Sequence, residues 1–345
     1  MRLGLIGCSM HWRSYEAALR ALPDLEVVAV APGAPDEDLA QFDGAPGVTA
    51  ATRRCESAEV LLSASGLDAV QVSTRLDLIG RWTRAALERG VPVMAEKPLA
   101  ASLEELDALR EVAQRTGVPV CAMHSQRGTP LVSAVREVVQ RGAIGTPLVA
   151  HSQKSYRWGN NRPAAFKDRR TFPGIAPSIG IHVVDWLLWI LGDRFEEVSG
   201  FESMAARAEW ACASHAAYLF KLSDAGMATV TMDYLRPEAA PSHGDERIRI
   251  AGTAGVVEVS TGYGTGTLID AQGVHDLELS AGTPWYAGFL CHVDAWRGRP
   301  APALPHVLPQ WEVFRVTEVA LKMQVAVETG TPVDLRQGPY RQPAA

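Results

Sequence analysis

The sequence predicts an α/β protein of two domains, in which a doubly wound parallel sheet is followed by a mixed, largely antiparallel sheet. Three observations lead to this prediction. The chain has 345 residues, roughly the length of two domains. Short, continuously apolar strands alternate with amphipathic helices over about the first 120 residues. Beyond about residue 125, β-rich stretches of alternating polarity replace this pattern.

In the first domain, strands and helices follow each other in regular order. Strands are expected at 3–6, 27–31, 68–73, 91–95 and 118–123. Helices are expected at 14–22, 58–63, 78–89 and 103–115. Gly90 and Gly117 end the last two helices, because glycine readily adopts the conformation that closes a helix. This alternation predicts a parallel sheet covered by helices on both faces.

The second domain has a different texture. Strands are expected at 146–156, 195–203, 207–222, 226–234, 246–251 and 255–260. Helices are expected at 130–141, 179–191, 286–297 and 308–329. No repeat or low-complexity linker separates the two parts. We therefore expect a dinucleotide-binding domain at 1–123, a substrate and oligomerisation domain at 124–335 and a short tail at 336–345.

The composition is typical of a protein that acts on small molecules. Acidic side chains outnumber basic ones by 39 to 33, the formal net charge is −6, and no long basic run is present. Nucleic acid and anionic membranes are therefore not expected as partners. The most apolar window, 179–191, is shorter than the ~20 residues that span a bilayer, and His182 and Asp185 interrupt it.

The cysteines favour a reducing compartment. The five are odd in number, far apart and without a CxxC pair, which is typical of reduced, mostly buried thiols. At the N-terminus, MRLGLIGCSM has a single charged side chain followed directly by a strand-like run, so we expect no signal peptide. A cytoplasmic location follows from both observations.

A dinucleotide site is expected where the first strand turns into the first helix. A pyrophosphate rests there on the helix N-terminus, and glycines let it approach the backbone. The turn, GCSMHW at 7–12, keeps only Gly7 of the GxGxxG pattern, with Ser9 and Trp12 in the other two places. No acid for a ribose hydroxyl ends the second strand, where 31–33 reads APG. The alternative is that Gly7 merely permits a tight turn.

A more specific motif, Glu96-Lys97-Pro98, follows the fourth predicted strand of this domain. With it, the chain resembles the Gfo/Idh/MocA oxidoreductases, which are named for glucose-fructose oxidoreductase and inositol dehydrogenase. Further matches follow in the family's order over nearly the whole chain. They are Asp68-Ala69-Val70, Ser73-Thr74, Arg127, Pro130, Gly142-Ala143-Ile144-Gly145, Gly180-Ile181-His182, Asp185 and Ile250-Ala251-Gly252-Thr253-Ala254-Gly255.

The resemblance implies a nicotinamide enzyme with an N-terminal Rossmann domain and a large, open C-terminal sheet that builds homodimers or homotetramers. The cofactor is NAD or NADP, and the choice stays open because the ribose-binding acid is missing. The implied cofactor-binding residues are Gly7, Cys8, Ser9, Met10, His11, Trp12, Ser73, Thr74, Arg75, Glu96 and Lys97. For Arg75, a surface salt bridge is the alternative to a phosphate or ribose contact.

Two residues are candidates for proton handling during hydride transfer. Oxidation of an alcohol needs a group that takes the hydroxyl proton and a donor that stabilises the developing oxyanion. Lys97 and His182 could supply both. Alternatively, Lys97 is only paired with Glu96, and His182 is a structural histidine held by Asp185, three residues further along the same helix face.

The segment before His182 departs from the family, because the usual Asp-x-Gly-x-His reads Ser178-Ile179-Gly180-Ile181-His182. Ser178 could bind a substrate hydroxyl or act as an ordinary helix N-cap. Donors and aromatic faces upstream suit a polyhydroxylated ring. The candidate substrate-binding residues are Lys154, Tyr156, Trp158, Ser178 and Asp185. No metal site is expected, since the histidines lack ligand spacing.

We therefore expect an oxidoreductase that transfers hydride between a nicotinamide and a hydroxyl of a sugar, polyol or related cyclic alcohol. One alternative is a lyase or glycosidase that oxidises its substrate transiently. The other is a non-catalytic scaffold that has lost efficient cofactor binding, since the second and third glycines, the ribose-binding acid and the aspartate before His182 are all missing.

Overall fold

The computed structural model describes residues 1–21, 23–63, 66–159, 163–206, 210, 212–279, 289, 293–295, 297–300 and 308–341. The chain packs into two compact units. One comprises Met1–Met123 with Pro284–Thr317, and the other comprises His124–Thr283 with Glu318–Ala345. Most of the helix expected at 286–297 lies outside the described residues.

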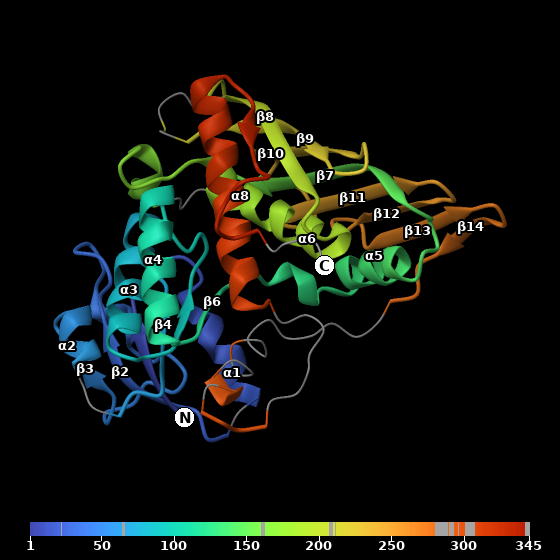
Figure 1. The fold of residues 1–345 in the computed structure, drawn as a ribbon. Helices are drawn as coiled ribbons and strands as arrows, with labels where there is room; N and C mark the ends of the chain where they lie inside the picture. The colour runs from blue at the N-terminus through green and yellow to red at the C-terminus, as the bar shows by residue number, and fades with distance from the viewer. Residues whose placement is uncertain are drawn as a thin grey trace. The chain divides into compact units, whose positions relative to one another are not determined.

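A six-stranded parallel sheet forms the centre of the first unit (Figure 1), which confirms the predicted fold class. Its strands lie in the order β3-β2-β1-β4-β5-β6. Their bounds are β1 (Arg2–Ile6), β2 (Glu26–Ala31), β3 (Arg53–Arg54), β4 (Ala69–Val72), β5 (Val93–Ala95) and β6 (Val120–Ala122). From β1 the chain adds β2 and β3 on one side and then β4, β5 and β6 on the other. The carboxyl ends of β1 and β4 therefore flank the topological switch point, where sheets of this type bind ligands.

Helices cover both faces of this sheet, α2, α3 and α4 on one and α1 on the other (Figure 1). Their bounds are α1 (Tyr15–Ala21), α2 (Ala58–Leu62), α3 (Ile79–Glu88) and α4 (Leu103–Thr116). Successive residues of β1 point to opposite faces of the sheet. Leu3 and Leu5 pack in a core with Tyr15 of α1, whereas Gly4 faces Leu61 of α2.

The second unit is built on a nine-stranded sheet in the order β14-β13-β12-β11-β7-β10-β9-β8-β15. Among the strand pairs of this sheet that the structure describes, β10 and β7 are parallel and all others are antiparallel. This confirms the prediction of a mixed, largely antiparallel sheet. The strands are β7 (Pro147–Arg157), β8 (Phe195–Ser203), β9 (His215–Leu222), β10 (Met227–Arg236), β11 (Gly244–Gly252), β12 (Val256–Ser260), β13 (Thr265–Asp270), β14 (Gly273–Asp276) and β15 (Val333–Asp334). The sequence predicts no strand at the last three, which are short and have mostly half-buried or exposed side chains, so they lack an apolar signature.

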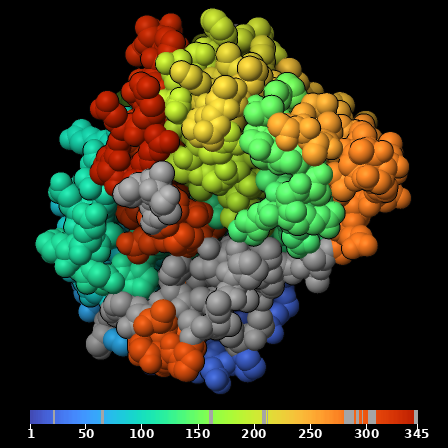
Figure 2. Space-filling view, turned by 45° about the vertical axis from the view of Figure 1, so that its right-hand side comes forward, coloured from blue at the N-terminus to red at the C-terminus, as the bar shows by residue number. Residues whose placement is uncertain are grey.

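Three helices accompany this sheet: α5 (Pro130–Gln140), α6 (Ile181–Leu191) and α8 (Gln310–Thr329), of which α8 passes from the first unit into the second. In α6, every residue from Ile181 to Ile190 is buried, and the Trp186 Nε1–H donates to Ser152 Oγ of β7 at 2.8 Å. Figure 2 shows α5 in green beside the orange strands β13 and β14. Within the described ranges, no helix has both the length and the apolarity to cross a bilayer.

Candidate functional site

The turn after β1 is packed tightly against the ends of two neighbouring strands. Gly7 has φ +88°, and its N–H donates to Ala31 O at 2.9 Å. A Cβ at this position would lie 2.4 Å from Ser73 O, beyond the end of β4. The Ser9 N–H donates to the same carbonyl at 3.2 Å. Gly7 is therefore required by the backbone itself, whatever the turn binds.

An acidic side chain does reach this turn, although none ends β2. Glu37 follows Ala31 by six residues, and the loop between them brings its carboxylate back to the sheet edge. Its Oε2 accepts the Gly33 N–H at 2.7 Å, and its Oε1 accepts the hydroxyls of Ser9 and Thr74, the latter at 3.0 Å. Glu37 was not predicted from the sequence, because it lies six residues beyond the strand end at which a ribose-binding acid is expected.

The residues at the end of β4 are engaged within the protein. Ser73 and Thr74 are fully buried, and Ser73 Oγ donates to Ser9 O at 3.0 Å. Arg75 makes a two-pronged ion pair with Asp77, with Nε–Oδ1 at 2.7 Å and Nη2–Oδ2 at 3.0 Å, and lies 3.7 Å from an oxygen of Asp36. The salt bridge weighed for Arg75 is therefore present, and its contact with a cofactor stays a prediction.

Two positions of the turn are explained by packing. Trp12, in the place of the third glycine, lies edge-on to Phe42 with ring centroids 5.1 Å apart. Its carbonyl accepts the Gln71 Nε2–H at 2.6 Å. Burial, reinforced by the charge of Glu37, raises the pKa of the Cys8 thiol to about 12. Cys8 is therefore an inert buried thiol and not a nucleophile.

Beyond the end of β5, Glu96 is a buried carboxylate shared by two partners. Its Oε2 accepts from His11, at 2.8 Å from Nδ1 and 3.3 Å from the backbone nitrogen. Its Oε1 accepts the Lys97 N–H at 3.0 Å and lies 3.9 Å from Lys97 Nζ. Burial by itself raises the pKa of Glu96, but His11 and Lys97 outweigh burial and lower that pKa to about 2. Because the carboxylate is ionised, His11 Nδ1 must be the donor.

The pairing of Lys97 with Glu96, weighed as an alternative to catalysis, is thus present. It does not exclude proton transfer, since Nζ lies beyond hydrogen-bond distance of the carboxylate. The Lys97 side chain is only 5% exposed, so its ammonium is largely removed from water. The Lys97–Pro98 peptide bond is cis.

In the second unit, Asp185 binds Arg127. The guanidinium donates to Asp185 Oδ1 from Nε at 2.9 Å and from Nη2 at 2.7 Å, and both side chains are buried. His124 Nδ1 lies 4.0 Å from the other oxygen, and the His124 ring is 6.5 Å from the buried ring of His182. Asp185 is thus anchored to Arg127, a residue that the family motif marked without a role, and its support of His182 stays a prediction.

Ser178 does not cap a helix. It lies in a π-helical turn, η6 (Ala176–Gly180), and α6 begins only after Gly180, so the N-cap interpretation is wrong. Its Oγ is 3.5 Å from the Tyr234 hydroxyl, and Tyr234 packs edge-on against Trp158 with ring centroids 5.1 Å apart. The structure therefore brings two predicted substrate residues together through Tyr234, which the sequence analysis did not single out.

Two further substrate candidates, Lys154 and Tyr156, lie on β7. Lys154 is fully buried, and its Nζ donates to Glu246 Oε1 at 2.8 Å. Burial lowers the pKa of Lys154, and Glu246 opposes this shift. The Lys154 ammonium also lies 4.6 Å from the centroid of the Tyr156 ring, which packs against His243. Substrate contact by Lys154 and Tyr156 stays a prediction.

Comparison with known proteins gives two matches to family models. A model described as an oxidoreductase family with an NAD-binding Rossmann fold matches residues 1–124, and the Gfo/Idh/MocA C-terminal domain matches residues 132–258. The chain belongs to the Gfo/Idh/MocA family of oxidoreductases. The resemblance seen in the sequence is thereby confirmed.

Individual relatives are distant. A solved Thermotoga maritima protein described as an oxidoreductase is 30% identical, covers 97% of this chain and 100% of its own, and has a TM-score of 0.87. The D-apiose dehydrogenase of Paraburkholderia graminis is 25% identical over 75% of this chain and 67% of its own. Inositol 2-dehydrogenase 1 of Saccharopolyspora erythraea is also 25% identical, over 80% and 79%.

The first unit of this Gfo/Idh/MocA protein fits a nicotinamide dinucleotide. Gly7 and Gly33 leave no room for a side chain, since a Cβ on Gly33 would lie 2.7 Å from Thr74. Both glycines therefore let the segments after β1 and β2 pack closely beside the switch point, where a Rossmann fold holds the pyrophosphate. Glu37 places a carboxylate at the same edge. Among the described residues, no group of three or more His, Cys, Asp or Glu could hold a metal ion.

Proposed function

We propose that this protein is an NAD(P)-dependent dehydrogenase or reductase that acts on a CH–OH group of a sugar, polyol or related cyclic alcohol. The observation that carries the proposal is the bond between His11 and Glu96, which joins the dinucleotide turn to the Glu-Lys-Pro segment. The names of the apiose and inositol dehydrogenases among its relatives support the substrate class.

Lys97 and His182 are the proposed proton-handling residues. The nicotinamide supplies the hydride chemistry. In the direction of oxidation, the hydroxyl proton passes to the neutral Lys97 amine as the hydride leaves carbon, and in reduction the Lys97 ammonium returns it. Glu96, an ionised carboxylate, lies 3.9 Å from Nζ. In the second unit, the Arg127–Asp185 ion pair anchors the helix that carries His182.

The cluster of Ser178, Tyr234 and Trp158 is proposed to bind substrate, with Lys154 and Tyr156 nearby on β7. Aromatic faces suit the C–H faces of a sugar ring, while hydroxyls suit its polar edge. The aspartate that the family usually has in place of Ser178 would carry a charge. With Ser178 the site offers a neutral hydroxyl, and proton handling falls to Lys97 and His182.

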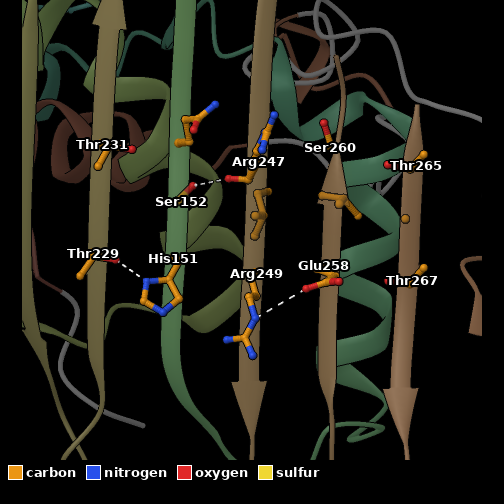
Figure 3. A pocket seen from close by; sticks show the side chains of 14 residues that line it. His151, Ser152, Thr229, Thr231, Arg247, Arg249, Glu258, Ser260, Thr265 and Thr267 are labelled. Carbon is orange, nitrogen blue, oxygen red and sulfur yellow. Dashed lines mark hydrogen bonds and ion pairs between the residues drawn. The ribbon is translucent and has the colours of Figure 1, made fainter. Parts of the chain in front are cut away.

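Self-association is proposed to use the open face of the nine-stranded sheet. This face carries a hollow of about 600 Å³. Figure 3 shows the side chains that line it. Most of the residues that line it have polar side chains, with Arg249 3.6 Å from Glu258 and His151 bonded to Thr229. Phe201 on β8 is 85% exposed. A homodimer or homotetramer formed through this sheet would cover these side chains.

A cytoplasmic location is also proposed, because Cys8, Cys55, Cys121 and Cys212 are free, buried thiols. Cys291 lies outside the described residues.

The decisive experiment titrates the purified protein with NADH and NADPH, by nicotinamide fluorescence and thermal shift, and then screens sugars and polyols with the cofactor that binds. Lys97→Met should abolish turnover while leaving the protein folded, as shown by circular dichroism. Arg84→Met, on an exposed basic residue of α3, is the control and should retain turnover.

Other outcomes favour the alternatives. Tightly retained cofactor with turnover but no net NADH production would indicate a lyase or glycosidase that oxidises its substrate transiently. Absence of binding by either nicotinamide at millimolar concentration would indicate a scaffold without cofactor, consistent with the replaced glycines at Ser9 and Trp12.

A further inference from the structure

We propose that Glu37 is the adenosine-ribose acceptor of this protein, held in place by Ser9 and Thr74, and that it selects NAD(H) over NADP(H). The proposal rests on the proposed dinucleotide binding and decides the cofactor choice that the sequence left open.

The carboxylate of Glu37 is anchored through one oxygen. Oε2 accepts the backbone N–H groups of Gly33 at 2.7 Å and Ala34 at 3.1 Å, just beyond the end of β2. These bonds come from the backbone and tie the side chain to the strand that lines the ribose position in folds of this type. Glu37 is half-buried, so part of the residue stays in contact with solvent while its carboxylate is held by these bonds.

The other oxygen faces hydroxyl groups. Oε1 accepts from Ser9 Oγ in the turn after β1 and from Thr74 Oγ1 beyond β4 at 3.0 Å. An ionised carboxylate has about four acceptor positions, and the two amides and two hydroxyls use them all. Two ribose hydroxyls present the same chemistry to Oε1 as Ser9 and Thr74 do. Since side-chain hydroxyls rotate, they can yield this oxygen when a ribose arrives.

Two departures from the dinucleotide motif thereby complement each other. A serine in place of the second glycine puts a hydroxyl into the turn, and the displaced acid supplies the acceptor for that hydroxyl. Without Glu37, Ser9 would lose this acceptor. Without Ser9 and Thr74, Oε1 would lose the donors that aim it at the switch point.

Charge opposes the 2′-phosphate of NADP(H) at this position. The phosphate would meet the ionised Glu37, with Asp36 and Asp38 on either side of it in the chain. The nearby cation, Arg75, is engaged by Asp77 at 2.7 Å and lies 3.7 Å from Asp36. Like charges at close range are repulsive, and Arg75 is already neutralised by carboxylates.

The test measures dissociation constants for NADH and NADPH by fluorescence and calorimetry, without substrate. The wild-type protein should bind NADH at least about tenfold more tightly than NADPH, as expected for loss of one charge-assisted hydrogen bond and gain of a repulsion. Glu37→Gln should remove most of this ratio. Asp43→Asn, which changes a 65% exposed acid further along the connection between β2 and β3, is the matched control and should keep most of it.

Thr74 provides a second variant in case Glu37→Gln does not fold. Thr74→Val should lower the NADH to NADPH preference severalfold, and Thr74→Ser, which restores the hydroxyl, should recover it. Equal binding of the two cofactors by the wild type, or a ratio unchanged by Glu37→Gln and Thr74→Val, would overturn this inference and leave the proposed function standing. Failure of the wild type to bind either cofactor would overturn both.

Discussion

His11 Nδ1 lies 2.8 Å from Glu96 Oε2, although 85 residues separate the two along the chain. The imidazole is 58% exposed, whereas the carboxylate is fully buried. His11 therefore connects solvent to the buried acid that flanks Lys97. In the first unit, this bond ties the turn after β1 to the segment after β5.

Removal of the His11 side chain should destabilise the protein. In His11→Ala, the buried Glu96 loses a charge-assisted hydrogen bond and keeps only backbone donors and Lys97, so we expect a loss of about 1–3 kcal/mol in the free energy of unfolding. Urea unfolding at pH 7 measures this loss. His275→Ala, which removes an exposed histidine paired with Asp270, should cost much less, and equal costs would contradict a special role for His11.

Glu96 should make stability depend on acid pH. Its pKa falls from an ordinary 4.5 to about 2 on folding, so the unfolded chain takes up the proton first as pH decreases. The corresponding stabilisation, on the order of 3 kcal/mol, is fully present above about pH 4.5 and is lost as pH falls towards 2. The stability gap between wild type and Glu96→Gln, measured by unfolding at pH 6, 4 and 3, should narrow steadily. A constant gap would argue against a depressed pKa.

The Arg127–Asp185 pair should be strongly coupled. Either Arg127→Met or Asp185→Asn leaves a buried polar or charged partner uncompensated, which typically costs about 3–5 kcal/mol. The double variant should cost clearly less than the sum of the two. The exposed pair Arg84–Glu88 of α3 serves as control, with an expected coupling of about 0–1 kcal/mol. Additive costs at Arg127 and Asp185 would show that the pair does not act as a unit.

Gly7 and Gly44 allow a matched comparison of two glycines with left-handed backbone. Gly7→Ala places a Cβ 2.4 Å from Ser73 O at φ +88°, whereas Gly44→Ala at φ +69° meets no atom within 4 Å. Gly44→Ala should cost about 1–2 kcal/mol for backbone conformation alone. Gly7→Ala should cost more and should also weaken NADH binding, since the turn must shift. Thermal unfolding and fluorescence titration compare the two, and equal effects would contradict the packing argument.

Much of the architecture was predictable because burial leaves a local periodic pattern. The expected helices 103–115 and 130–141 differ from α4 and α5 by a single residue at one end, since amphipathic spacing and terminal glycines or prolines are read directly from neighbouring residues. The hairpin of β13 and β14 has no such pattern, because most of its side chains are half-buried or exposed. Pairing across the hairpin, not burial, defines those strands.

The sequence by itself determined the two sheets, the family and the identity of Glu96, Lys97 and His182 as candidates, because these depend on periodicity and on contiguous motifs. Only the tertiary structure decided the hydrogen-bond partners of the buried polar groups. Glu37 accepts from Ser9, Arg127 donates to Asp185, and His11 donates to Glu96. The physical reason is that a buried polar group must find a partner, and the partner is the group that folding brings within about 3 Å, however far away it lies in the chain.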